Sequence, residues 1–272
     1  LAMPFQPAVV DMVRSRATSA ATAVIDGDRQ LSYAQLDERS NRLAQALAAE
    51  GIAPGHRVGF LGRNCAEFFE LMFAAAKLGA VVCAVNWRLS AEEVAYILGD
   101  SDAHIVVAHS EFAPTIPSGM HVVLIDGERP GYASMRNSAP NVDPGYIPGK
   151  AETWLQLYSS GTTGHPKGVL ITYGNLHAFL QAGLDLNGIT GESVSMVALP
   201  VFHIGGTGWA MQALANGAAL VVMRDFTPAH VLRLVERHRV THSLWVPTMI
   251  QMMMGCTEPA DVSSIRFIMY GA

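Results

Sequence analysis

The stretch VGFLGRNCAEFFELMFAAAKLGAVVCAV, residues 58–85, decides the fold class. It opens with a short apolar run over residues 58–61, continues with apolar positions at helical spacing, and ends on an uninterrupted apolar run over residues 80–85. A fully apolar strand is typical of a parallel sheet covered by helices on both faces. The stretch therefore predicts a strand–helix–strand unit, in which Asn64 caps the helix and Gly79 ends it.

The same alternation extends in both directions from this unit. Towards the N-terminus, a hairpin turn at residues 26–29 is followed by a helix from Tyr33 to Gly51. Towards the C-terminus, Ser90 and Glu93 fit a capping box that starts a helix, and Thr227-Pro228 fits a later helix start. Further strands are predicted at residues 105–108, 154–158, 169–172, 194–199, 219–223, 243–246 and 265–270.

This order predicts an α/β fold, built as two lobes of mostly parallel β-sheet flanked by helices. Residues 1–109 are expected to form the first lobe and residues 151–272 the second. Between them, residues 110–150 are rich in proline and glycine and contain one short strand at residues 122–125, so they are interpreted as a connector.

Composition excludes several classes of protein. The chain carries 18 Lys and Arg against 23 Asp and Glu, a net charge of −5, which argues against a nucleic-acid partner. Its three cysteines, Cys65, Cys83 and Cys256, are widely spaced, which favours a reducing, cytoplasmic location. Charged residues near the N-terminus argue against a secretory signal, and no uncharged apolar run is long enough for a transmembrane segment.

The most informative segment for function is Tyr158-Ser-Ser-Gly-Thr-Thr-Gly-His-Pro-Lys-Gly168. Its glycines let the backbone approach a ligand closely, its hydroxyls donate hydrogen bonds, and Lys167 supplies a positive charge that suits phosphate oxygens. The spacing differs from a Walker A loop, and a strand rather than a helix is predicted to follow Lys167. A flexible Ser/Gly loop is the alternative, but the joint spacing of three glycines, Pro166 and Lys167 favours a polyphosphate site.

This segment resembles the phosphate-binding signature of the adenylate-forming superfamily, which includes acyl- and aryl-CoA ligases, peptide-synthetase adenylation domains and beetle luciferases. Three further segments resemble family motifs in the family's order. They are Lys77-Leu78-Gly79-Ala80 with Val85-Asn86, Leu199-Pro200-Val201-Phe202-His203, and Tyr270-Gly271-Ala272. The resemblance covers the chain from Tyr33 to its end and places it in the N-terminal part of such an enzyme, an acyl-CoA synthetase or fatty-acid–CoA ligase.

The resemblance implies that a carboxylic acid is activated with ATP and then transferred to CoA, with Mg²⁺ bridging phosphate oxygens. His203, Thr163 and Lys167 would be catalytic, and Thr163 would also contact the metal ion. The β- and γ-phosphates would be held by the loop, and the adenine by the turn at the end of the chain. The expected cofactor-binding residues are Ser159, Ser160, Gly161, Thr162, Thr163, Gly164, Lys167, Gly271 and Ala272.

The expected acid pocket consists of His203, Gly205, Trp209 and Val246. In the family, the residue matching His203 lies beside the carboxylate that is activated, and Trp209 would shorten the acyl pocket. Plain core packing is the alternative for Trp209. Amino-acid-activating members tend to carry an Asp near this position; because none follows Phe202, a fatty or aryl acid is favoured.

The chain stops just after a predicted strand, which indicates a truncated domain. The family continues with an acidic Mg²⁺ motif, an Asp that holds the ribose, and a mobile C-terminal lid with a catalytic Lys. We therefore expect the fragment to be weakly active or inactive. The alternatives to an acyl-CoA ligase are an acyl-AMP ligase that loads a carrier protein and a non-catalytic nucleotide-binding or interaction module. Self-association, for example as a homodimer, is also open.

Overall fold

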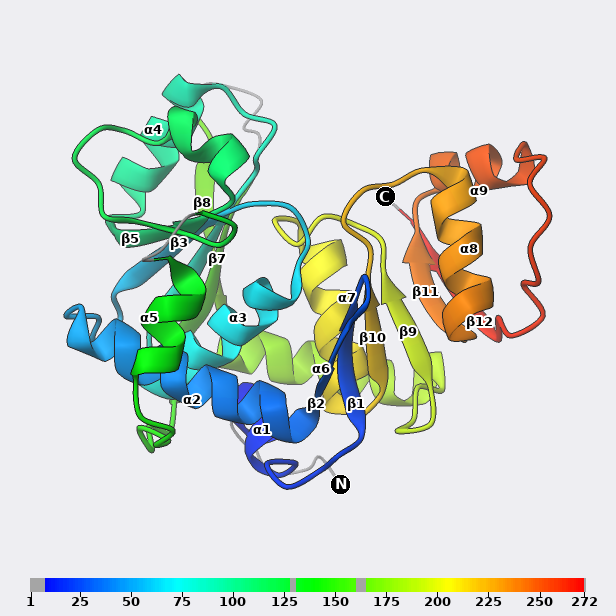
Figure 1. Cartoon of the computed structure of the whole chain (residues 1–272), viewed down its shortest axis with the longest axis horizontal. Coiled ribbons are helices and arrows are strands. Elements are labelled where there is room, and N and C mark those ends of the chain that lie inside the picture. The colour runs from blue at the N-terminus through cyan, green and yellow to red at the C-terminus, as the bar shows by residue number, and fades with distance from the viewer. Residues whose placement is uncertain (1–7, 128–130, 160–164, 272) are drawn as a thin grey trace. The chain divides into compact units, whose positions relative to one another are not determined.

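The computed structural model describes residues 8–127, 131–159 and 165–271 of the chain. The chain forms two compact units, coloured along the sequence in Figure 1. The first unit comprises residues 1–17, 35–63 and 67–177, and the second comprises residues 18–34, 64–66 and 178–272. Each unit is built around one six-stranded sheet.

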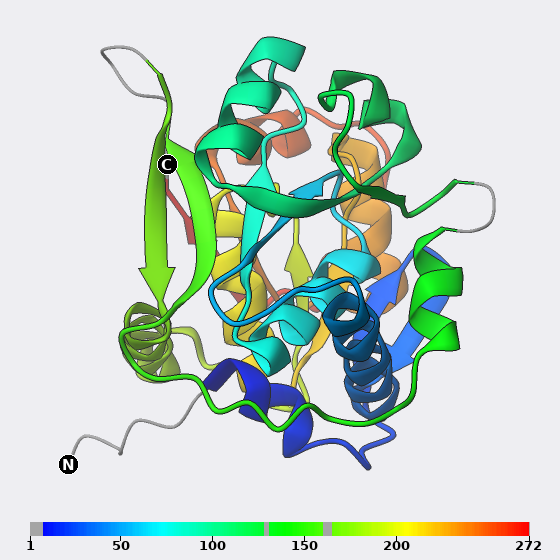
Figure 2. The same cartoon turned by 90° about the vertical axis from the view of Figure 1, so that its left-hand side faces the viewer.

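The sheet of the first unit has the strand order β6-β5-β3-β4-β7-β8. All its strand pairs are parallel except β7 with β8, which form an antiparallel hairpin at one edge, seen on the left in Figure 2. The strands are β3 (Arg57–Leu61), β4 (Val81–Val85), β5 (Ala103–Ala108), β6 (Val122–Leu124), β7 (Thr153–Ser159) and β8 (Lys167–Thr172). The helices are α1 (Ala8–Arg14), most of α2 (Tyr33–Ala49) and α3 (Ala66–Leu78), α4 (Ala91–Asp100), η1 (Ser110–Thr115) and α5 (Tyr132–Ser138).

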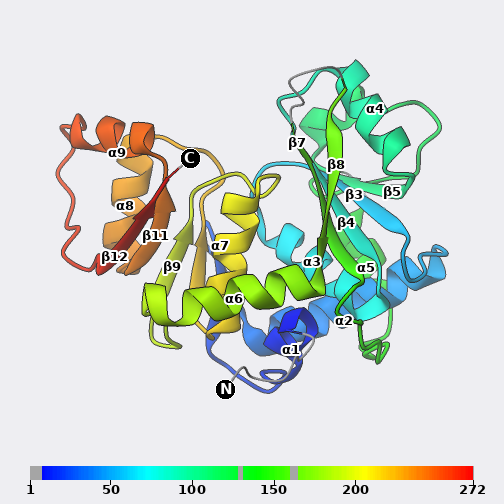
Figure 3. The ribbon, with the colours of Figure 1, turned by 180° about the vertical axis from the view of Figure 1, so that it is seen from behind.

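The sheet of the second unit has the strand order β12-β11-β9-β10-β1-β2, and all its pairs except β1 with β2 are parallel. Figure 3 shows its strands β12, β11 and β9. The strands are β1 (Thr22–Asp26), β2 (Arg29–Ser32), β9 (Val194–Val197), β10 (Ala219–Val222), β11 (His242–Trp245) and β12 (Phe267–Tyr270). The helices are most of α6 (Tyr173–Asn187), α7 (Ile204–Ala215), α8 (Pro228–His238) and α9 (Pro247–Met254).

Helices cover both faces of this second sheet. Val231 and Val235 of α8 pack in one apolar cluster with Trp245 of β11. On α7, a Cβ added to Gly205 would lie 3.6 Å from the side chain of Leu244, the neighbour of Trp245. Because successive side chains of a strand point to opposite faces, α7 and α8 lie on opposite sides of the sheet.

The elements begin where local sequence signals place them. Strand β4 is buried along its whole length, as its continuous apolar run predicts. The capping box at α4 is formed, with Ser90 and Glu93 each accepting a hydrogen bond from the other's backbone N–H. The Thr227 hydroxyl caps α8, and Pro228 follows at its first turn. The α/β fold class predicted from the sequence is thus confirmed.

The expected division into residues 1–109, 110–150 and 151–272 differs from the two units. Strands β1 and β2 join β10 in the second sheet, whereas β7 and β8 join β4 in the first. Part of the expected connector also contributes an element, since β6 pairs with β5. Local periodicity identifies strands but does not indicate which distant strand each one pairs with. The sequence therefore did not predict that β1 and β2 belong to the second sheet and β7 and β8 to the first.

Among the described residues, no helix is both long and apolar enough to cross a membrane.

Candidate functional site

The predicted phosphate-binding segment, residues 158–168, joins the two strands of the β7–β8 hairpin. Ser159 is the last residue of β7 and Lys167 the first of β8, and the two are opposite each other in the antiparallel register. Both side chains are exposed. The remaining predicted phosphate ligands, Ser160, Gly161, Thr162, Thr163 and Gly164, lie outside the described residues.

The Lys167 ammonium is available for a ligand. Within the part of the chain that the structure describes, no carboxylate lies within ion-pair distance of this group. Lys167 starts a strand, whereas the lysine of a Walker loop opens a helix. That the lysine, the hydroxyls and the backbone N–H groups of the loop bind a polyphosphate stays a prediction.

The second group of predicted residues lies in the second unit. His203 follows β9, Val246 follows β11 and Gly271 follows β12. Since β9, β11 and β12 are neighbouring parallel strands, these three residues lie at the same edge of the sheet, at its carboxyl end. Ligands of open α/β sheets bind at this edge.

The local fold of the β9–α7 turn explains how His203 is placed. Its backbone N–H donates to Pro200 O (3.1 Å), and its carbonyl accepts from the N–H groups of Gly206 and Thr207 (3.0 and 3.1 Å). A Cβ at Gly206 would lie 2.2 Å from Pro200 O, so only glycine fits this close backbone approach. The His203 side chain is exposed and its ring lies 4.6 Å from that of Phe202.

Two further predicted pocket residues lie on α7. Gly205 is half-buried and faces Leu199 and Leu244. Trp209 is 3 % exposed, and its ring stacks on that of Phe267 with centroids 6.4 Å apart and planes 9° apart. Its indole Nε1 is buried and has no hydrogen-bond partner among the described residues.

Asn64, expected as a helix cap, has a different role. Its side-chain amide donates to Leu199 O (3.0 Å) and Met223 O (3.1 Å) and accepts from Val201 N–H (3.0 Å). The α3 N-terminus is instead satisfied by Asp26, whose carboxylate accepts from Ala66 N–H at 3.0 Å. The capping prediction was therefore wrong. Asn64 connects the segments after β9 and β10 by hydrogen bonds. The neighbouring sequence could not predict this role, because the partners of Asn64 are far away in the chain.

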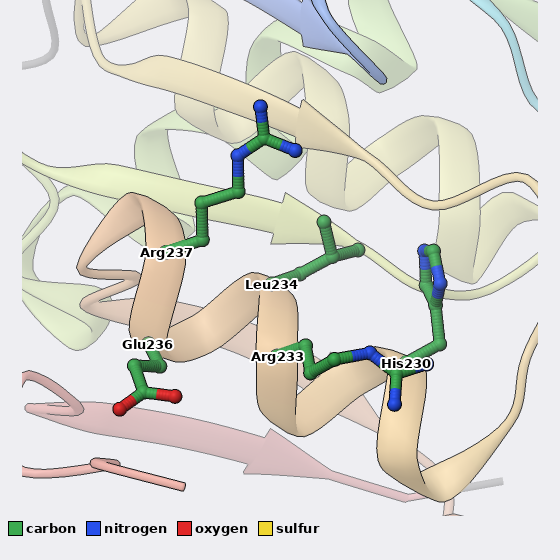
Figure 4. A pocket seen from close by; sticks show the side chains of 5 residues that line it. All are labelled: His230, Arg233, Leu234, Glu236 and Arg237. Carbon is green, nitrogen blue, oxygen red and sulfur yellow. The ribbon is translucent and has the colours of Figure 1, made fainter.

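A surface pocket on α8 is a less suitable candidate. His230, Arg233, Leu234, Glu236 and Arg237 line it (Figure 4). Arg233 already pairs with Glu258 (2.6 Å) and Arg237 with Asp28 (2.8 Å). Nor do the described residues contain a group of three or more His, Cys, Asp or Glu side chains placed to hold a metal ion.

The fold is an α/β fold with two mostly parallel sheets, and the segment between β7 and β8 is the candidate phosphate site. Comparison with known proteins gives the family: the chain matches AMP-binding enzymes over residues 13–272, and it belongs to this family.

Curated relatives include the fatty acid–acyl-carrier-protein ligase ScoC of Streptomyces coeruleorubidus, 36 % identical over 92 % of this chain and 50 % of its own length. The long-chain-fatty-acid–CoA ligase FadD13 of Mycobacterium tuberculosis is 32 % identical over 94 % of this chain and 53 % of its own. The chain thus spans about half the length of these relatives.

Solved structures give the same assignment. The N-terminal domain of FACL13 from Mycobacterium tuberculosis matches with a TM-score of 0.89 and 29 % identity, covering 97 % of this chain and 69 % of that one. The anthranilate–CoA ligase AuaEII in complex with anthranoyl-AMP matches with a TM-score of 0.91 and 25 % identity, covering 99 % of this chain and 55 % of that one. The fold is therefore that of the N-terminal domain of adenylate-forming enzymes.

Proposed function

We propose that this chain carries the ATP-binding part of an acid–thiol ligase that works through an acyl-adenylate. In the first step, a carboxylate oxygen attacks the α-phosphorus of ATP, and the bond to the β-phosphate breaks to release pyrophosphate. In the second, a thiolate attacks the acyl carbonyl carbon and AMP leaves. The supporting observation is the exposed side chain of Lys167, which pairs with Ser159 where strands β7 and β8 meet their connecting loop. The sequence of this loop is rich in glycine and in residues with hydroxyl groups.

The reaction needs charge neutralisation and alignment more than covalent chemistry from the protein. Lys167 would neutralise the β- and γ-phosphates together with Mg²⁺, and the Thr163 hydroxyl is our proposed protein contact of that ion. His203 would lie beside the carboxylate, with Gly205, Trp209 and Val246 around the acyl group. Gly271 and Ala272 would contact the adenine.

A fatty or aryl acid is the proposed substrate class, and the cytoplasm the proposed location. CoA is the proposed thiol. A carrier protein is the second candidate, favoured by the 36 % identity to a ligase that is named for an acyl-carrier protein. Thioester formation by an active full-length enzyme, with CoA and with a phosphopantetheinyl carrier protein as competing acceptors, separates the two.

Nucleotide binding is the first test of the proposal. We expect the chain to bind MgATP in isothermal titration calorimetry and Lys167→Ala to weaken binding about tenfold or more, because a charge-assisted contact to phosphate is lost. Lys150→Ala removes another exposed lysine of the same unit and is the matched control. No binding by the unaltered chain, or equal affinity of Lys167→Ala and Lys150→Ala, would contradict the proposal.

A further inference from the structure

Helix α4 contacts strand β7 and the residue His165, which lies just before β8. Tyr96 and Asp100 are four residues apart on α4, and residues with this spacing lie on one face of a helix. Asp100 contacts Tyr158, next to the end of β7, and Tyr96 contacts His165, two residues before β8. One helix face therefore reaches the chain on both sides of the phosphate-binding loop.

The contact on the β7 side is a chain of hydrogen bonds. The Tyr158 hydroxyl donates to Asp100 Oδ2 (2.6 Å) and accepts from Gln156 Nε2 (2.9 Å), and Gln156 Oε1 accepts from Arg57 Nε (3.3 Å). Burial and the neighbouring Asp100 carboxylate raise the pKa of Tyr158, so its hydroxyl keeps the proton that it donates.

Gly168 leaves the space for this arrangement. A Cβ at this position would lie 2.7 Å from Gln156 Nε2 and 3.2 Å from the Tyr158 hydroxyl. The last glycine of the signature therefore lets the Tyr158 and Gln156 side chains lie against β8, directly beside Lys167.

The contact on the β8 side is an aromatic stack. The rings of Tyr96 and His165 lie 4.5 Å apart with 16° between their planes. Only Pro166, whose φ is restricted by its ring, separates His165 from Lys167. A ring held in this position limits the directions that the backbone can take as it enters β8.

We propose that Tyr96 and Asp100 are positioning residues, which hold the two ends of the phosphate-binding segment and so orient Ser159 and Lys167 towards the polyphosphate. The inference rests on the proposed function, since it assigns these residues to the binding of ATP. A segment fixed before binding loses less conformational freedom when the ligand arrives, so the contacts should strengthen phosphate binding without touching the ligand.

The test compares disruptive and conservative variants of the same two residues. Tyr96→Leu removes the ring and Asp100→Ala the acceptor, whereas Tyr96→Phe keeps the stack and Asp100→Asn keeps an oxygen that can accept from Tyr158. We expect the disruptive variants to raise the Kd for MgATP about three- to tenfold, the effect of one lost hydrogen bond or aromatic contact. The conservative variants should bind within about twofold of the unaltered chain. The disruptive variants should lower the unfolding midpoint in urea by no more than about 0.5 M, because one lost contact costs about 1 kcal/mol, and all four variants should therefore be folded in the binding assay.

A second readout does not depend on nucleotide. Amide hydrogen exchange at Lys167 and Gly168 should be faster in Tyr96→Leu and Asp100→Ala and unchanged in the conservative variants. Unchanged exchange in the disruptive variants would overturn the inference, as would faster exchange with unaltered MgATP affinity. If the unaltered chain binds no MgATP, the proposed function fails, while the exchange rates still decide whether α4 holds the hairpin.

Discussion

At the scale of single residues, Trp209 has two possible roles, core packing and selection of the acid substrate. Its ring is buried against Phe267, as expected of a core residue, yet its Nε1 has no partner among the described residues. The Nε1 atoms of Trp154 and Trp245 are also buried without a partner among the described residues, so this donor does not by itself distinguish Trp209. The position on α7, six residues after His203, is consistent with the end of an acyl pocket.

We predict that Trp209→Ala in an active full-length enzyme shifts the preferred acid to a longer one. Removing the indole opens volume between α7 and β12, which an extended acyl group can fill. Kinetics with a graded series of straight-chain and aryl acids measure the shift as a change in relative kcat/KM, and Trp209→Phe, which keeps a stacked ring, is the control. An unchanged acid profile in a folded Trp209→Ala enzyme would assign the residue to the core.

Contacts of single residues can be predicted from the sequence only when both partners are close together in the chain. The Ser90–Glu93 capping box was predicted because both partners lie within one helical turn. The Asn64 ties and the Tyr96–His165 stack could not be predicted, because their partners are 69 or more positions apart in the sequence. Lys167 was predicted as a phosphate ligand from the composition and spacing of its own segment, and this role stays a prediction.

At the scale of elements, a cluster of charged side chains joins α1, α2 and α3 to the segment before β7. The Lys77–Asp37 pair is buried and the Arg14–Asp143 pair half-buried, and Lys77 Nζ lies 3.9 Å from Asp143 Oδ2. The Lys77 ammonium of α3 is fully buried and donates to Asp37 Oδ1 (2.6 Å) and Asn41 Oδ1 (2.5 Å) of α2. Arg14 of α1 binds Asp143 through two hydrogen bonds (2.6 and 2.7 Å). Burial would raise the pKa of Asp143, but the hydrogen bonds from Arg14 and from Gly145 N–H hold it below its ordinary value.

We predict that Lys77→Met lowers the free energy of unfolding by about 3–5 kcal/mol, because it leaves the nearly buried Asp37 carboxylate without its counter-charge. The double variant Asp37→Leu/Lys77→Met should recover most of this loss, since a pair of apolar side chains needs no compensation. Urea unfolding followed by circular dichroism measures the free energy of unfolding of both variants. Arg233→Met, which breaks an exposed ion pair, should cost below about 1 kcal/mol. A double variant as unstable as Lys77→Met would contradict this explanation.

The strands and turns were predicted well because the residue patterns that specify them lie within the elements themselves. Each predicted strand is present, with ends displaced by a few residues, and the turn before Arg29 connects β1 to β2 as expected. The pairing of β1 with β10 and of β4 with β7 was not predicted, since it depends on contacts between segments far apart in the chain.

At the scale of the whole molecule, ATP binding and turnover should be separable. The hairpin that carries Lys167 belongs to the first unit, and the sheet edge with His203, Val246 and Gly271 to the second. The chain nevertheless spans only 50 % of ScoC and 53 % of FadD13. In the family that the sequence resembles, the acidic Mg²⁺ motif, the ribose-binding Asp and the lid Lys follow the segments found here.

We therefore predict that the purified 272-residue chain binds MgATP but catalyses acid-dependent ATP–pyrophosphate exchange at least about a hundredfold more slowly than full-length FadD13 assayed in parallel, because it spans about half of that ligase and a single group that stabilises transition-state charge contributes about that factor. Exchange measured with labelled pyrophosphate and a panel of fatty and aryl acids gives the rate, and Lys167→Ala gives the background. If the chain exchanges pyrophosphate at a rate close to that of FadD13, the prediction is wrong, and residues 1–272 contain every group that the first step requires.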